Sequence, residues 1–140
     1  MKAKEYLQQL KRFDTVIHQK MNEIQDLRLK SQSIGSIDCS KEAVQTSSSG
    51  DASFAKLINR IIDLETEIET EIEKYACEKH KIINQIQTLE QTKHIDILYK
   101  RYVEFKRLQM IAVEMNFTYQ YVVELHGYAL KEFQRTYKNL

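Results

Sequence analysis

The side chains best suited to recognise a ligand lie on one face of a helix predicted over residues 119–135. They are Thr118, Tyr119, Gln120, Val123 and Glu124. A glutamine amide can pair with the edge of adenine, and valine methyls or a tyrosine ring can contact the methyl group of thymine. The Glu124 carboxylate either accepts a hydrogen bond from a cytosine amino group or simply keeps the helix soluble. The pattern therefore predicts a surface that reads the base edges of duplex DNA.

Cationic side chains flank this face and are candidates for phosphate contacts. They are Lys100, Arg101, Lys106, Arg107 and Lys131. Phosphate contacts position a protein on DNA without reading its sequence. The alternative for each residue is an ordinary surface cation. The formal net charge of +1 neither requires nor excludes a nucleic-acid partner.

Residues that could perform catalysis do not converge in the sequence. Cys77 and His80 form a lone pair of potential ligands, whereas zinc requires three or four. The other histidines, His18, His94 and His126, are scattered, and no glycine-rich phosphate loop occurs. We therefore expect a protein that is not an enzyme, with no catalytic residue, no metal and no cofactor. His126 is expected to pack against the fold or to touch a phosphate.

A tight turn between two short helices must position the base-reading face. Ala112 is small enough for a close helix crossing, and Asn116 tolerates the left-handed conformation that the turn needs. Thr118 can cap the following helix, while Val122 and Leu125 face inward. With helices predicted over residues 95–104, 108–115 and 119–135, this spacing is typical of a helix-turn-helix. The alternative is a generic cluster of three helices.

The first 93 residues predict a long antiparallel helical hairpin. Apolar residues recur every three or four positions over residues 3–30, which indicates one helix face. A second stripe repeats every seven residues, as in a coiled coil: Phe54, Ile61, Ile68, Tyr75, Ile82 and Leu89. The serine-rich segment near residues 31–53 is expected to be a loop. A homodimer through these helices would cover the apolar surface that the shorter first helix leaves exposed.

An acidic row marks the second long helix. It consists of Glu65, Glu67, Glu69, Glu71 and Glu73. Most such rows are solvated helix faces. The sharper alternative is that they face a basic partner or mimic a DNA backbone.

Three segments near the end of the chain resemble region 4 of sigma-70 factors. They are residues 98–104 (Leu-Tyr-Lys-Arg-Tyr-Val-Glu), 111–115 (Ile-Ala-Val-Glu-Met) and 122–130 (Val-Val-Glu-Leu-His-Gly-Tyr-Ala-Leu). Residues 3–7 and 44–51 are similar to the same small phage and prophage proteins, which combine a helical N-terminal half with a sigma-like C-terminal half. Because relatives of that family regulate phage late genes, the resemblance implies a role in transcription. Phe105 stands where such domains often have glycine, and Gln120 and Val123 stand where basic residues are common.

These observations predict an all-α protein with a helical hairpin over residues 1–93 and a helix-turn-helix domain over residues 94–140. The expected function is that of a phage or prophage transcription regulator, bound to double-stranded DNA at the nucleoid in the bacterial cytoplasm. A contact with RNA polymerase or a sigma factor is a further expectation. The alternative is a helical adaptor or anti-sigma-like protein that binds the transcription machinery without reading DNA. No apolar run reaches the ~20 residues of a membrane span, so no membrane partner is expected.

Overall fold

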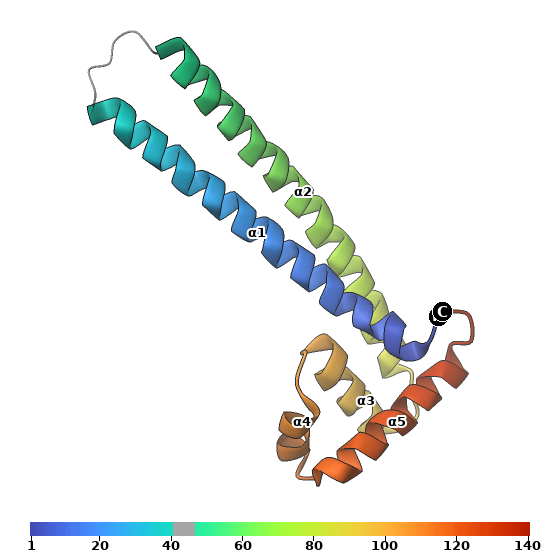
Figure 1. Ribbon diagram of the computed structural model, residues 1–140. Helices are drawn as coiled ribbons and strands as arrows, with labels where there is room; N and C mark the ends of the chain where they lie inside the picture. Colours follow the sequence, from blue (N-terminus) through green and yellow to red (C-terminus); the bar gives the residue numbers. More distant parts are fainter. Residues whose placement is uncertain (41–46) are drawn as a thin grey trace. The chain divides into compact units, whose positions relative to one another are not determined.

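All regular secondary structure in the described part of the chain is helical, which confirms the all-α fold class. The computed structural model describes the backbone of residues 1–40 and 47–140, and the side chains of residues 1–32 and 52–140. The elements in chain order are α1 (Ala3–Ser40), α2 (Ser47–Gln87), α3 (Thr92–Leu98), the π-helical turn η2 (Tyr99–Val103), α4 (Leu108–Met115) and α5 (Tyr119–Thr136) (Figure 1).

The two long helices extend into the serine-rich segment. The prediction of a loop over residues 31–53 is wrong at both ends, because residues 31–40 and 47–53 are helical. Serine costs a helix only roughly 0.5 kcal/mol per residue relative to alanine, and the chain contains no proline that would break the backbone ladder. Residues 41–46, in the middle of the predicted loop, lie outside the described residues.

The helices pack into two compact units. One unit, here called the composite unit, consists of residues 1–14 and 74–140, and the other, the helix-pair unit, consists of residues 15–73. α1 and α2 therefore contribute to both. The predicted division at residues 93 and 94 follows the change in sequence pattern and stays a prediction, whereas the compact units follow the packing of side chains.

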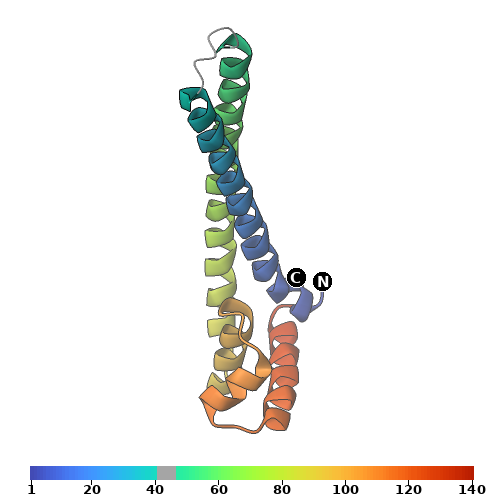
Figure 2. The ribbon, with the colours of Figure 1, turned by 60° about the vertical axis from the view of Figure 1, so that its left-hand side comes forward.

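In the helix-pair unit, segments of α1 and α2 lie side by side and run antiparallel (Figure 2). Ile24, Ile61, Leu64 and Ile68 form its buried core. Ion pairs join α1 to α2 in this unit: Lys20 to Glu67 at 3.7 Å, Glu23 to Arg60 at 3.4 Å, and Arg28 to Glu65. Lys20 also reaches Glu71 at 3.9 Å. Three members of the acidic row thus face cations of α1.

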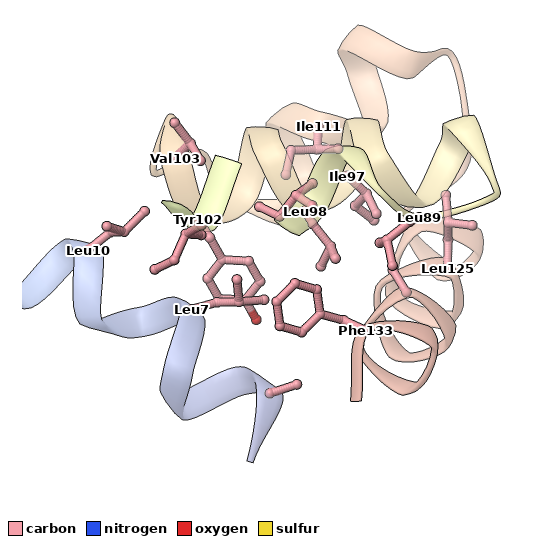
Figure 3. Packing of buried hydrophobic residues seen from close by; sticks show 14 of the residues in the cluster. Leu7, Leu10, Leu89, Ile97, Leu98, Tyr102, Val103, Ile111, Leu125 and Phe133 are labelled. Carbon is pink, nitrogen blue, oxygen red and sulfur yellow. The ribbon is translucent and has the colours of Figure 1, made fainter. Parts of the chain in front are cut away.

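The composite unit is built around one apolar cluster. Residues of α3, η2, α4 and α5 contribute to it, together with the start of α1 and the end of α2. Phe133 of α5 is fully buried at its centre. Figure 3 shows the residues around it, among them Leu7 and Leu10 of α1, Leu89, Ile97, Leu98, Tyr102, Ile111 and Leu125. Hydrogen bonds fix the same arrangement: the Ala3 N–H donates to Gln134 Oε1 at 2.6 Å, and the Tyr6 hydroxyl donates to Gln85 Oε1 at 2.8 Å. The start of α1 is therefore part of the same core as the three short helices.

Candidate nucleic-acid interface

The turn between α4 and α5 has a closed hydrogen-bond pattern. Asn116 is left-handed, with φ 57° and ψ 41°. The Phe117 N–H donates to the Ala112 carbonyl at 3.0 Å and the Asn116 N–H to the Val113 carbonyl at 3.3 Å, which is the Schellman arrangement of a helix end. Thr118 Oγ1 then accepts from the Tyr121 N–H at 3.2 Å and caps α5. The carbonyls at the end of α4 and an N–H at the start of α5 are thus satisfied within the turn.

This turn determines which face of α5 is exposed. Ile111, Ala112, Val122 and Leu125 are buried in the cluster shared by α4 and α5. The opposite face of the first two turns of α5 is exposed, and all five predicted base-reading residues lie on it or at its cap: Thr118, Tyr119, Gln120, Val123 and Glu124. The structure therefore brings this set together as one surface.

Gly127 continues the exposed face by one more turn. It lies inside α5, where glycine is roughly 1 kcal/mol less favourable than alanine. A Cβ atom built at this position meets no heavy atom within 4 Å. Packing within the protein therefore does not require glycine here. A position without a side chain on an exposed helix face allows another molecule to approach the backbone closely.

The predicted phosphate-binding cations before α4 are engaged within the protein. Lys106 Nζ lies 2.8 Å from Glu114 Oε1 and 3.1 Å from Glu104 Oε2, and Lys100 Nζ lies 3.1 Å from Glu114 Oε2. The hydrogen bonds to Glu114 and Glu104 raise the pKa of Lys106, and the bonds from Lys106 and Lys100 lower the pKa of Glu114. Two lysines and two glutamates thus form a cluster with no net charge.

The other three predicted phosphate contacts differ in their availability. Arg101 is half-buried and donates from Nη1 to the Lys106 carbonyl at 3.0 Å, so it holds the connection between η2 and α4. Arg107 is exposed at the start of α4. Lys131 is exposed, with its Nζ 5.6 Å from the centroid of the Tyr128 ring. Of the predicted set, Arg107 and Lys131 remain open to a ligand.

Phe105 has a backbone conformation that is uncommon for a residue with a side chain. Its φ is 58°, the left-handed region that favours glycine. The ring is partly buried against the main cluster, and Lys11 Nζ lies 4.7 Å from its centroid. Packing of the ring therefore offsets a backbone conformation that phenylalanine rarely adopts.

Lys93 is a residue of this surface that the sequence analysis missed. Its Nζ lies 5.2 Å from the Phe117 centroid and 5.7 Å from the Tyr121 centroid, and it donates to the Tyr121 hydroxyl at 3.4 Å. Because Lys93 precedes the interface by more than twenty positions, no local spacing links it to the turn. A cation beside two rings is held in place while its charge stays exposed.

A buried pair ties the end of α5 to the start of α3. His94 Nδ1 hydrogen-bonds Glu132, and Glu132 Oε1 also accepts from the Glu90 N–H at 2.9 Å. Burial alone would raise the pKa of Glu132, but the hydrogen bonds from His94 and from the backbone at Glu90 and Gln91 hold it below its usual range. The charged carboxylate thus joins two helices that are distant in sequence.

His126 packs into the fold, one of the two roles expected for it. Its Nε2 lies 2.8 Å from the Tyr102 hydroxyl, and the two rings are stacked with centroids 5.7 Å apart. Burial, with the nearby charges of Arg101 and Lys4, lowers the pKa of His126 to about 4. Burial also raises the pKa of Tyr102 to about 12. The pair is therefore neutral at physiological pH.

We expect acid to destabilise the fold through His126. The unfolded chain binds this proton near pH 6.5, whereas the folded chain binds it only near pH 4. The free energy of unfolding should therefore fall as the pH drops from about 6.5 towards 4. Urea unfolding at about pH 7.5 and about pH 5 measures the slope. A His126→Phe variant should show a shallower slope than the wild type, whereas replacement of the exposed His80 by glutamine should not; equal slopes in all three proteins would contradict the assignment.

Within the described part of the chain, no group of three or more histidine, cysteine, aspartate or glutamate side chains is placed to hold a metal ion. Cys77 is a free, exposed thiol. None of the described helices has a stretch both long and apolar enough to cross a bilayer.

Comparison with family models, with curated proteins and with solved structures gives no match for this chain. The interpretation of the interface therefore depends on its own residues.

Proposed function

We propose that this protein is a DNA-binding transcription regulator whose α4–turn–α5 segment acts as a helix-turn-helix. The observation that carries the proposal is the single exposed surface on the first two turns of α5, opposite the buried Val122 and Leu125. An α-helix fits the major groove of B-DNA, and recognition helices contact bases with their N-terminal residues. In this proposal Gln120 pairs with adenine, Tyr119 and Val123 contact thymine methyl groups, and Gly127 lets the helix backbone lie close to the DNA.

The resemblance to sigma region 4 supports the biological setting of the proposal. It favours a phage or prophage regulator that acts on the nucleoid in the cytoplasm of a bacterial host and contacts RNA polymerase or a sigma factor. A homodimer through the long helices is the assembly we propose, because Met21, Leu29, Ile62 and Ile72 of the helix-pair unit are exposed.

A second candidate function is a helical adaptor that binds the transcription machinery without reading DNA. The observation that favours it is the surface of α4, where Val113 is 77% exposed and Met110 is 55% exposed. The neutral cluster of Lys100, Lys106, Glu104 and Glu114 also leaves that side of the interface with little positive charge. Exposed apolar side chains of this kind suit a protein partner better than a phosphate backbone.

Selection of binding sites from random duplex DNA with the full-length protein tests the first function. We expect an enriched sequence. On that sequence, Gln120→Ala should weaken binding by about 1–3 kcal/mol and have far less effect on random DNA, because it removes a contact to a base edge. Arg107→Ala should weaken binding to both DNAs equally, because a phosphate contact carries no sequence information.

Two outcomes would change the proposal. If no sequence is enriched and the protein instead binds purified RNA polymerase or a sigma factor, the adaptor function replaces DNA recognition. If a sequence is enriched but neither substitution affects its binding, the protein reads DNA with a different surface.

A further inference from the structure

A groove along α5 adds two cations, Arg135 and Lys138, to the predicted phosphate contact Lys131. Its lining includes Tyr121, Tyr128, Lys131, Arg135 and Lys138. Residues 121, 128 and 135 are seven positions apart on α5, so the groove follows the length of the helix, and Lys138 lies just beyond its end. From Tyr121 to Arg135 the helix rises roughly 20 Å at 1.5 Å per residue.

The charge of this groove is positive at one end. Arg135 and Lys138 are exposed, and no ion pair within the described part of the chain engages either of them. Lys131 rests over the Tyr128 ring with its charge exposed. Among the described residues that line the groove, Glu124 is the one carboxylate, and it lies near Tyr121 at the opposite end. Positive charge therefore collects beside the C-terminal half of α5.

Two of the cations before α4 are instead paired within the protein. Lys100 and Lys106 are paired with Glu104 and Glu114, so binding a phosphate there would first require those ion pairs to break. A free cation neutralises a phosphate without this cost, and it releases the counterion held by the DNA. The more available anion-binding surface thus lies along α5.

We infer that the phosphate backbone of duplex DNA lies along this groove, and that Arg135 and Lys138, together with Lys131, hold it. The inference rests on the proposed function and names the contacts that position the recognition helix. The tyrosines provide uncharged hydrogen-bond donors in the same lining, which suits phosphate oxygens. Glu124 lies at the end where α5 meets base edges, away from the end that holds the backbone.

The test measures the salt dependence of binding with the full-length protein and a fluorescently labelled random-sequence duplex. A double variant, Arg135→Gln with Lys138→Gln, removes two phosphate contacts. The slope of log K against log salt should become shallower by about 1.8, and binding at 0.1 M salt should weaken roughly 60-fold, at 0.9 per contact. The matched variant, Lys100→Gln with Lys106→Gln, removes the same formal charge from the paired cluster and should change the slope by less. Unchanged melting temperatures would show that both variants are folded.

The outcomes separate this inference from the function on which it rests. If the groove variant keeps the wild-type slope, or the paired-cluster variant loses as much slope as the groove variant, the inference is overturned. Sequence-selective binding that still responds to Gln120→Ala would then leave the proposed function intact. If the wild-type protein binds polyglutamate but no duplex DNA, both fail, and the groove is assigned to an acidic protein segment.

Discussion

A fragment of residues 94–140 is expected to be unfolded in isolation, although it contains the whole predicted helix-turn-helix. The cluster around Phe133 includes Tyr6, Leu7 and Leu10 of α1 and Ile82, Ile86 and Leu89 at the end of α2. Burial of one such aliphatic side chain contributes about 1.5–3 kcal/mol. Loss of several exceeds the stability of ordinary domains, and fewer than fifty residues rarely form a sufficient core alone. Circular dichroism should therefore show little helix and no cooperative thermal transition.

The matched control keeps the composite unit and removes the helix-pair unit. The rings of Phe13 and Tyr75 lie 6.1 Å apart, so a short glycine-serine linker can join residue 14 to residue 74. This shortened chain should fold cooperatively and retain any DNA binding of the full-length protein. A cooperatively folded 94–140 fragment would show instead that the start of α1 is dispensable.

Replacement of Phe133 by alanine is expected to lower the free energy of unfolding by about 3–5 kcal/mol. The side chain is completely buried, with Tyr6 at 6.1 Å and Tyr137 at 5.1 Å between ring centroids. Truncation of a buried phenylalanine removes its apolar contacts and leaves a cavity, which together cost this amount. Because Phe133 contacts α1 and its own helix bears the base-reading face, DNA binding should also decrease at temperatures near the new midpoint.

Urea unfolding measures this change, and Tyr128 provides the control. Tyr128 lies on the same helix and is 58% exposed, so Tyr128→Ala should alter the free energy of unfolding by no more than about 0.5 kcal/mol. Similar effects of the two substitutions would contradict the position of Phe133 in the core.

Local sequence signals predicted the elements around the interface well. The helices expected over residues 108–115 and 119–135 correspond to α4 and α5, and Asn116 and Thr118 have the backbone and capping roles expected of them. Such features depend on neighbours within a few positions, so spacing and residue type suffice to predict them. The positive φ of Phe105 was not predicted, because phenylalanine rarely adopts the left-handed region.

The same local reasoning could not predict contacts between residues that are distant in sequence. The ion pairs of Lys100 and Lys106 depend on Glu114, which approaches only when α4 folds back towards η2. Lys93 reaches the interface through Phe117 and Tyr121, and the apolar start of α1 gives no indication that its partner is α5. An amphipathic pattern shows that a face is buried, but it does not identify the surface that buries it.

The hydrogen bond between Ala3 and Gln134 spans 131 positions of the chain, and this separation constrains how the protein is made. A ribosome adds about 5–20 residues per second, so roughly 6–25 s pass between the synthesis of residue 14 and that of the end of α5. During that interval the start of α1 lacks its native contacts with Phe133 and Gln134 of α5. Contacts of such long range also slow folding, because the intervening chain must close before they form. The interface should therefore mature only after α5 has been synthesised, and a ribosome stalled before α5 would leave part of the apolar surface around Leu7 and Leu10 open to chaperones.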